Sequence, residues 1–415
     1  MLQEIASPFG LATTSVSMLF FYISTAVFIG GIFIVYWLHN QYHLDIVVIP
    51  TLPLSEGPLI SVCVPARNEE RNIRLCVESL LAQDYPNFEV IVLEDRSTDR
   101  TPEILRDLVM ESDGKPPGRK ERAPLLQILH GTDLPKGWAG KPHALFQAST
   151  AARGEWLCFV DADTFLSPNT LSACYAKAIA TKADMFTIMT SQILGSFWEK
   201  VVMPIVMTAL SVGFSPRKVN DPSSRDAIAN GQFILIKRSV YDAIGGHERV
   251  KDQIVEDKAL AEQVKWNGYG LVVANGYAVA RTRMYTSLPE MWEGWTKNIY
   301  LGLSDRPSLA ILGVFGAFLA LVAALILPIW PVLGLFWYFR GGGWLALTVI
   351  AKSLLLWAMV IHARARVAIG MGLSPWYALT LPLGAAIFAA MMVTSTWKVL
   401  SGKGVTWKGR LYTLK

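Results

Sequence analysis

The chain has 415 residues, of which 52% are hydrophobic and 17% are charged, whereas soluble domains carry about 25% charged residues. The net charge of +5 is small, and Lys and Arg form no block interleaved with aromatic residues, so a nucleic-acid partner is not expected. Residues 5–44, 307–339 and 367–397 contain no Asp, Glu, Lys or Arg. The sequence therefore predicts a water-soluble domain held between membrane segments.

Residues 1–45 are predicted to form an N-terminal membrane anchor. The apolar span covers about residues 17–38, which is long enough to cross about 30 Å of hydrocarbon as a helix. The segment has neither a basic start nor a cleavage site with small residues, so it is expected to be retained and not removed as a signal peptide.

Strand-like and helix-like segments alternate through residues 58–305, the predicted soluble domain. Short apolar runs typical of strands are followed by stretches with helical spacing. The expected strands are 59–64, 88–93, 125–129 and 156–160, and the expected helices are 70–82, 101–110 and a segment beginning at Pro142. This alternation predicts an α/β fold with a mostly parallel sheet, in which ligands bind beyond the carboxyl ends of the strands.

Residues 196–214 are apolar but begin with Glu199 and Lys200. A helix in the core of the soluble domain and a helix lying in the membrane interface both fit this pattern. The aromatic and methionine side chains of the segment favour the interfacial helix.

Residues 307–397 are predicted to form a C-terminal membrane region followed by a basic tail, 398–415. The region holds three candidate spans, 309–330, 344–361 and 376–397. Lys352 near the centre of the second either argues against that span or indicates a snorkelling or buried charge. Because basic segments tend to remain in the cytosol, we expect the tail to be cytosolic. One candidate would then form a hairpin or lie in the interface.

Asp161 and Asp163 follow the fourth expected strand and are separated by one residue. Residues i and i+2 of a strand point to the same side, so both carboxylates could face one cation. Carboxylate oxygens suit Mg²⁺ or Mn²⁺, which would bridge the phosphates of a nucleotide donor. Taken alone, two acidic residues in a turn are a weak signal.

Polar clusters also follow the first two expected strands. They are candidate contacts of the nucleotide donor, because carboxylates at strand ends suit a ribose hydroxyl or a base edge. The candidates are Pro65, Arg67, Glu69, Glu94 and Asp95. Ser97-Thr98-Asp99 could instead be only a helix N-cap. Lys141 ends a loop bracketed by glycines, where it could bind a phosphate or be solvated.

Glu256 and Asp257 stand at the start of an expected helix, 258–266. Acidic residues at this position often only compensate the helix dipole. The alternative is a general base, because an acceptor hydroxyl that attacks a sugar must lose its proton to a nearby carboxylate.

Four motifs occur in this order along the chain: residues 65–69, 94–99, 161–163 and 256–257. Their order and spacing resemble those of family 2 glycosyltransferases with the GT-A fold, and the resemblance covers about residues 59–303. The resemblance implies that Asp95 contacts the nucleotide base or ribose. It also implies that Asp163 and Asp161 bind the metal and that Asp257 is the base. Glu94 stands where the family has Asp, which is a departure from the pattern.

Processive members of the family, such as cellulose and chitin synthases, carry a Q-x-x-R-W signature after the base. Residues 290–298 here read EMWEGWTKN, without the Gln and Arg, so a processive enzyme is not expected. Trp292 and Trp295, with Glu256, are predicted to contact the acceptor, although Trp295 could equally be an interfacial anchor or a core aromatic. Together with residues 407–412, the pattern is similar to membrane glucosyltransferases acting on carotenoids, hopanoid-type lipids or ceramide.

These features predict an integral, multi-pass membrane enzyme with its catalytic domain on the cytoplasmic face of the cell membrane. The expected reaction is inverting transfer of one sugar from a UDP-glucose-type donor to a lipid hydroxyl. Three alternatives remain open: a polyprenyl-phosphate glycosyltransferase, a processive polysaccharide synthase, and a membrane scaffold with a degenerate transferase domain.

Overall fold

The computed structural model describes residues 8–41, 44–113, 126–213, 215–303, 307–401, 404–407 and 410–412. Parts of the predictions lie outside these ranges. They are residues 1–7 and 42–43 of the anchor, residues 114–125 and 304–305 of the soluble domain, residue 214 of the apolar segment, and residues 402–403, 408–409 and 413–415 of the tail. The chain divides into two compact units. The sheet unit comprises residues 43–196, 213–310 and 395–415, and the helical unit comprises residues 1–42, 197–212 and 311–394.

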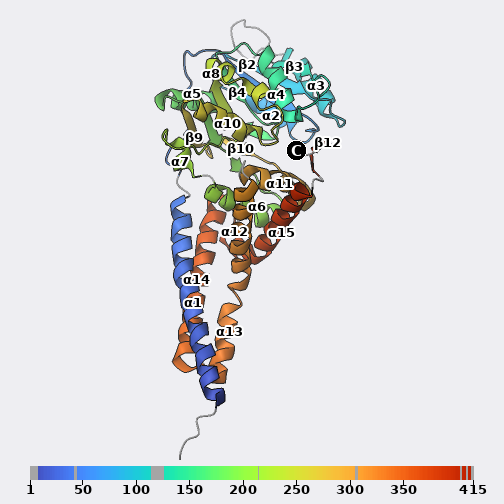
Figure 1. Ribbon diagram of the computed structural model, residues 1–415. Helices are drawn as coiled ribbons and strands as arrows, with labels where there is room; N and C mark the ends of the chain where they lie inside the picture. Colours follow the sequence, from blue (N-terminus) through green and yellow to red (C-terminus); the bar gives the residue numbers. More distant parts are fainter. Residues whose placement is uncertain are drawn as a thin grey trace, which may run out of the picture. The chain divides into compact units, whose positions relative to one another are not determined.

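The sheet unit, in which Figure 1 labels β2, β3, β4 and β9, is built on a seven-stranded sheet with the order β3-β2-β1-β4-β8-β6-β9. Within this sheet, β8 is antiparallel to both of its neighbours, β4 and β6, and every other adjacent pair is parallel. The predicted α/β fold with a mostly parallel sheet is therefore confirmed. The strands are β1 (Ile60–Ala66), β2 (Phe88–Glu94), β3 (Leu126–His130), β4 (Trp156–Phe159), β6 (Met185–Met189), β8 (Ile234–Lys237) and β9 (Leu271–Asn275).

Helices cover both faces of this sheet, because successive strand residues point to opposite sides. In β1, Val62 and Val64 pack with helices α2, α3 and α5, whereas Cys63 packs with α4, α8 and α10. Both layers are apolar and close to fully buried, so each large side chain contributes about 1.5–3 kcal/mol to folding. The helices of the unit are α2 (Ile73–Leu81), α3 (Thr101–Asp113), α4 (Gly140–Ala151), α5 (Thr170–Ala180), α7 (Pro216–Asn220), α8 (Arg238–Ala243), α9 (Gly246–Arg249), α10 (Glu256–Trp266) and α11 (Leu288–Leu303).

Two smaller sheets complete the unit. Strand β10 (Ala280–Thr282) lies between β5 (Thr164–Leu166) and β7 (Ser191–Gln192), so residues that follow Asp163 pair with a strand more than 100 residues later. The tail forms a hairpin of β11 (Val405–Trp407) and β12 (Arg410–Tyr412). Because β11 contacts α11, the basic tail belongs to the same unit as the large sheet.

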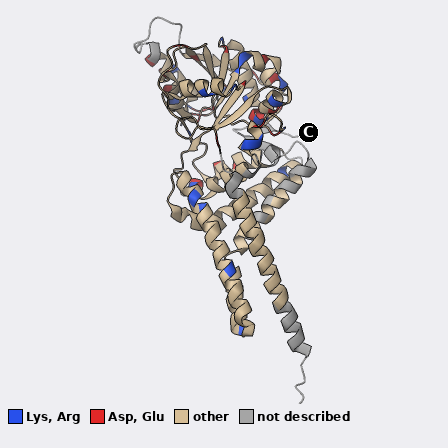
Figure 2. Cartoon of the chain, turned by 90° about the vertical axis from the view of Figure 1, so that its left-hand side faces the viewer, with Lys and Arg blue, Asp and Glu red and all other residues tan. Residues whose placement is uncertain are grey.

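The helical unit contains long apolar helices with few charges (Figure 2). Three described segments are long and apolar enough to cross a membrane: Met18–Trp37, Trp330–Gly370 and Pro375–Leu400. The helices are α1 (Pro8–Gln41), α6 (Phe197–Gly213), α12 (Pro307–Ile326), α13 (Trp330–Trp337), the π-helical η1 (Tyr338–Gly342), α14 (Gly343–Gly370), the 3₁₀-helical η2 (Pro375–Thr380) and α15 (Leu381–Leu400).

The segment Trp330–Gly370 is a helical hairpin and not one long helix. A continuous α-helix would separate residues 334 and 350 by about 24 Å, yet a Cβ on Gly334 would lie 2.8 Å from Cγ1 of Ile350. The chain reverses at Arg340 and Gly341, whose backbone angles are not helical. Gly341 has φ +91°, a left-handed value that glycine adopts without steric cost.

Lys352 of α14 is held by α1. Its ammonium group donates to Oγ1 of Thr25 at 2.6 Å and lies 4.1 Å from the ring centre of Phe21. A charge inside an apolar helix is tolerated when a neighbouring helix supplies such partners. Lys352 is half-buried, and whether α14 crosses a membrane stays a prediction.

Helix α6 packs closely against α15 within the helical unit. Val201 to Val206 are all buried, and a Cβ on Gly384 would lie 2.7 Å from the carbonyl oxygen of Val201. The small size of Gly384 therefore permits the contact between the two helices. The predicted interfacial placement of α6 stays a prediction.

Candidate functional site

The loops that follow β1 and β2 hold each other in place. The guanidinium group of Arg67 donates to the carbonyl oxygens of Asp95 and Arg96, at 2.7 and 3.1 Å. The N–H of Thr98 donates to Oδ1 of Asn68 at 2.8 Å. Asn68 and Arg96 have φ angles of +52° and +55°, which are uncommon for residues other than glycine. Backbone strain is thus concentrated where the sequence predicted donor contacts.

The predicted donor residues Pro65, Glu69, Glu94 and Asp95 lie on this edge of the sheet. Pro65 is in β1 opposite Leu93 of β2, and the N–H of Glu69 donates to the Thr101 hydroxyl oxygen at 2.8 Å. The side chains of Glu94 and Asp95 are both buried. The structure therefore brings the two donor motifs together, while their contact with a nucleotide stays a prediction.

Ser97-Thr98-Asp99 also has the helix-capping role that the sequence left open. Oδ1 of Asp99 accepts from the N–H of Thr101, the first residue of α3, at 3.0 Å. Its Oδ2 accepts from the N–H of Glu70 at 3.0 Å. Asp99 therefore joins the start of α3 to the loop after β1.

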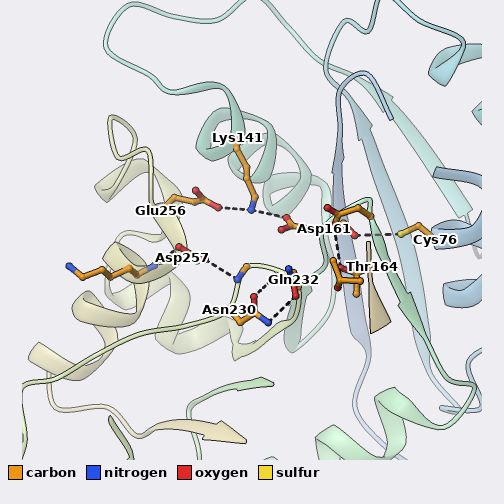
Figure 3. Close-up of polar contacts among 12 residues, drawn as sticks. Cys76, Lys141, Asp161, Thr164, Asn230, Gln232, Glu256 and Asp257 are labelled. Atoms are coloured by element: carbon orange, nitrogen blue, oxygen red, sulfur yellow. Dashed lines mark hydrogen bonds and ion pairs between the residues drawn. The ribbon is translucent and has the colours of Figure 1, made fainter. Parts of the chain in front are cut away.

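Lys141 connects three separate elements at the centre of the candidate site. It lies in the first turn of α4, and its Nζ is 2.7 Å from Oδ1 of Asp161 and 2.8 Å from Oε1 of Glu256 (Figure 3). Asp161 follows β4, and Glu256 begins α10. The structure therefore places a predicted phosphate contact, a predicted metal ligand and a predicted acceptor contact within one set of ion pairs.

Asp257 lies beside this bridge and is held by backbone groups. Its Oδ2 accepts from the N–H of Gly231 at 2.9 Å, and its Oδ1 accepts from the N–H of Lys258 at 2.7 Å. Part of the residue remains accessible to solvent, while protein atoms surround the carboxyl group. A carboxylate that two fixed donors hold in place can accept a proton from a bound molecule.

The neighbouring carboxyl groups of Glu256 and Asp257 have opposite pKa shifts. Burial would raise the pKa of Glu256, but Lys141 holds it below its ordinary value. Burial, together with the charge of Glu256, raises the pKa of Asp257 to about 6. Burial would lower the pKa of Lys141, but Asp161, Glu256 and Asp257 raise it well above its ordinary value. Lys141 therefore remains a cation and Glu256 an anion at neutral pH.

The local geometry of Asp161 and Asp163 differs from the expected one. Strand β4 ends at Phe159, and Asp163 lies in a turn before β5, closed by the N–H of Thr164, which donates to the carbonyl oxygen of Asp161 at 3.0 Å. The prediction that both carboxylates share one side of a strand was therefore wrong. The chain turns here because Thr164 begins β5, which pairs with β10.

Within the described ranges, no group of three or more His, Cys, Asp or Glu side chains is placed to hold a metal ion. Asp161 and Asp163 nevertheless provide oxygen ligands of the kind that Mg²⁺ and Mn²⁺ prefer. Mg²⁺ commonly uses one or two protein carboxylates and takes its other ligands from phosphates and water. The donor chemistry of the pair therefore fits a cation that shares its coordination with a bound diphosphate.

Sequence reasoning missed two residues of this cluster, Gly231 and Lys297. Gly231 interrupts an apolar stretch before β8 and has no side chain to signal a role. Lys297 lies in α11, where burial lowers its pKa to about 8 and the charges of Glu256, Asp257 and Asp161 act in the opposite direction. In the sequence, the only signal of a role for Lys297 was its position two residues after Trp295, a predicted acceptor contact.

The two tryptophans predicted to contact the acceptor differ in exposure. Trp292 is half-buried, whereas Trp295 is 5% exposed and packs against Tyr285 with ring centres 6.2 Å apart. Among the residues that the structure describes, the buried indole N–H of Trp295 has no hydrogen-bond partner. Such a donor is costly to bury, so a bound molecule that accepts from it would gain a favourable contact. The acceptor role of both residues stays a prediction.

Comparisons with known proteins agree with this fold. Residues 61–245 match the family described as Glycosyl transferase family 2. A 4,4'-diaponeurosporenoate glycosyltransferase from Staphylococcus aureus (strain USA300) is 26% identical over 367 residues, which cover 86% of this chain and 88% of the relative. A mannosyltransferase from Pyrobaculum calidifontis, solved with GDP-Man and Mn²⁺, is similar in structure with a TM-score of 0.52. It is 17% identical, and the similarity covers 92% of this chain and 99% of the other. This likeness confirms the predicted GT-A fold.

The raised pKa of Asp257 predicts how the reaction rate depends on pH. A base must be unprotonated, so the rate should be highest above the pKa of about 6 and fall as the pH decreases through it. Lys141→Met removes a positive charge that lowers this pKa, so the fall should move to higher pH. The measurement is kcat/KM for sugar transfer as a function of pH.

The matched control for this measurement is Lys237→Met, which removes a lysine paired with Asp184 at 2.8 Å in the same unit. Its profile should coincide with that of the parent. A parent rate that stays constant well below pH 6 would show that Asp257 is not the group that must lose its proton.

Proposed function

We propose that this chain is a family 2 glycosyltransferase that transfers one sugar from a nucleotide-sugar donor to a lipid acceptor. The observation that carries the proposal is the bridge from Lys141 to Asp161 and Glu256, with Asp257 beside it. It gathers a phosphate-binding cation, a metal-binding carboxylate and a base into one cluster. The long apolar helices of the chain support an acceptor drawn from the membrane.

We propose that the donor lies across the ends of β1, β2 and β4. The loops after β1 and β2 would bind the nucleoside, with Asp95 at the base or ribose. Lys141 would then contact the diphosphate, because it lies beside Asp161 and is held as a cation. A UDP-glucose-type donor is the proposed substrate, and the reaction is a single inverting displacement.

Asp161 and Asp163 would hold Mg²⁺ or Mn²⁺ together with the donor phosphates. The cluster contains four negatively charged carboxylates and the two positively charged ammonium groups of Lys141 and Lys297, so a divalent cation would balance its charge. The carboxylates are those of Asp161, Asp163, Glu256 and Asp257. When bound, such a cation stabilises the negative charge that develops on the departing diphosphate. The two lysines would supply part of the same stabilisation, because the leaving group gains charge near them.

Asp257 would accept the proton of a hydroxyl acceptor as the acceptor oxygen attacks the sugar. The N–H groups of Gly231 and Lys258 orient both carboxylate oxygens before the acceptor binds. Preorganised groups of this kind avoid the cost of ordering them during the reaction. The raised pKa keeps Asp257 a stronger base than an exposed aspartate while it is still ionised at neutral pH.

A carboxylate acceptor is the second candidate, favoured by one observation. The S. aureus relative is named for 4,4'-diaponeurosporenoate, and that ending denotes a carboxylate. A carboxylate oxygen carries no proton at neutral pH, so transfer of the sugar to a carboxylate acceptor would need no general base. A polyprenyl phosphate would behave in the same way.

We propose that the sheet unit lies at the cytoplasmic face of the cell membrane and that the basic tail lies on the same side. The contact between β11 and α11 supports the shared side. The hairpin of α13 and α14 supports an arrangement in which the chain enters and leaves the bilayer from one face.

Asp163→Ala is expected to abolish transfer, because the cation would lose a protein ligand. Chelation of divalent cations in the parent should have the same effect, and added Mn²⁺ or Mg²⁺ should restore it. The measurement is transfer of labelled glucose from UDP-glucose by purified protein. Full activity of the parent in the presence of chelator would contradict a metal-dependent site.

Asp257→Asn distinguishes the acceptor classes. Asn is nearly the same size but cannot accept the proton, so transfer to a hydroxylated lipid should fall by about 10²-fold or more. Transfer to a lipid carboxylate or phosphate should fall much less. If the variant and the parent transfer sugar to a lipid hydroxyl at the same rate, a different residue is the base.

Radiolabelled UDP-glucose and a hydroxylated membrane lipid are expected to yield label in the organic phase as a lipid with one sugar. Trp295→Ala should reduce this transfer more than it reduces hydrolysis of the donor by water, because Trp295 is proposed to contact the acceptor. Trp295→Phe removes the indole N–H together with part of the ring, and transfer that survives in this variant would show that the indole N–H is not a required contact.

Two results would contradict parts of this proposal. Label that accumulates in the aqueous phase as a growing polymer would identify a polysaccharide synthase. Equal losses of transfer and hydrolysis in Trp295→Ala would remove this residue from the acceptor site while leaving a lipid acceptor in place.

A further inference from the structure

Gly231 lies in the short loop before β8, between Asn230 and Gln232, which Figure 3 labels beside the candidate site. It is buried, and its N–H donates to Oδ2 of Asp257 at 2.9 Å. This hydrogen bond needs only the backbone, which every residue except proline could provide. The hydrogen bond alone therefore does not explain why the position is glycine.

The space beside the α-carbon of Gly231 explains it. A Cβ at this position would lie 2.9 Å from Nζ of Lys141, 3.1 Å from Oδ2 of Asp257 and 3.6 Å from Oδ2 of Asp161. Real Cβ atoms essentially never approach another atom within 3.0 Å. A methyl group and the ammonium group of Lys141 therefore cannot both keep these positions.

The loop itself cannot readily move aside, because buried hydrogen bonds fix both of its ends. The N–H of Asn230 donates to the hydroxyl oxygen of Thr187 at 3.0 Å, and its side-chain amide donates to the carbonyl oxygen of Ile188 at 2.9 Å. Oε1 of Gln232 accepts from that amide at 3.2 Å and also from the Thr190 hydroxyl. Moving the loop would leave several buried polar groups unsatisfied.

Lys141 is the partner that would move. Its Nζ stands at the end of a flexible four-carbon chain, whereas Asp257 is held by two backbone N–H groups. The bridge to Asp161 and Glu256 depends on the present position of Nζ, at 2.7 and 2.8 Å. Displacement of Nζ would break this bridge and remove a positive charge from the surroundings of Asp257.

We propose that Gly231 is a positioning residue of the transferase, whose missing side chain provides the space in which Lys141 bridges Asp161 and Glu256. The inference rests on the proposed sugar transfer, which it deepens by assigning a role within that site. It predicts that a single methyl group at position 231 acts through Lys141 and not through the fold.

A double-mutant cycle on the full-length protein tests this inference, because only residues that act through each other give non-additive effects. The proteins are the parent, Gly231→Ala, Lys141→Met and the double variant, in detergent or nanodiscs. Gly231→Ala should lower transfer, and about 10²-fold is the loss expected if Nζ is misplaced by about 1 Å. In the Lys141→Met background the same methyl group should cost little, since the group it displaces is already absent.

The pH profile provides a readout that a merely structural role would not move. Gly231→Ala should shift the fall in kcat/KM to higher pH, as Lys141→Met does, because both remove the same charge from Asp257. The matched control is Gly370→Ala in α14, where an added Cβ would meet no atom within 4 Å. This variant should keep the parent rate and the parent profile.

Each other outcome decides the inference. Transfer at the parent rate by Gly231→Ala, or the same fold-loss in both backgrounds, would overturn it while sugar transfer itself stands. If Gly231→Ala fails to fold, recovery of folding in the double variant would support the clash with Lys141, and failure of both would contradict it.

If the parent transfers no sugar, the proposed function fails. The coupling between Gly231→Ala and Lys141→Met is then measured from the unfolding temperatures of the same four proteins as a function of pH. Additive effects of the two substitutions on these temperatures would overturn the role of Gly231.

Discussion

The ammonium group of Lys141 is the interaction on which the site depends. It joins the start of α4, the end of β4 and the start of α10 through ion pairs of 2.7 and 2.8 Å. Without it, Asp161, Glu256 and Asp257 would repel one another in a partly desolvated space, which is costly unless the charges are compensated. The same group is the natural partner for the phosphates of a donor, so one side chain both stabilises the acidic cluster and prepares it for its substrate.

The position of Lys141 also separates the roles of two neighbouring acids. Glu256 makes the ion pair and remains an anion, whereas Asp257 makes none with Lys141 in the structure and has its pKa raised to about 6. Pairs of carboxyl groups whose environments differ in this way are typical of sites that need one fixed charge and one proton carrier. The arrangement requires close packing over Gly231, because any side chain there would enter the space of Lys141.

Hydrophobic periodicity predicted the first four strands of the large sheet and helices α2, α3, α4 and α10, because strands buried on both faces and amphipathic helices leave distinct patterns. Strands β6, β8 and β9 and helices α5, α7, α8, α9 and α11 were not predicted. The acidic motifs were predicted because each follows a strand or begins a helix. The turn at Asp161–Asp163 was not, since it depends on the pairing of β5 with β10, far along the chain. Gly231 and Lys297 were missed because their roles arise from contacts with residues distant in sequence. The reversal at Arg340 and Gly341 lies between the candidate spans 309–330 and 344–361, so its place agrees with the sequence, but its backbone geometry was not predicted.

The central claim is that this site places one sugar on a membrane lipid. Mass spectrometry of lipid extracts from cells with and without the gene tests it most directly, because it requires no assumption about the donor or the acceptor. The account predicts a lipid species that is heavier by one hexose and present only when the gene is present. Identical lipid profiles in the two strains, with a new polysaccharide in the aqueous fraction of the strain that carries the gene, would contradict it.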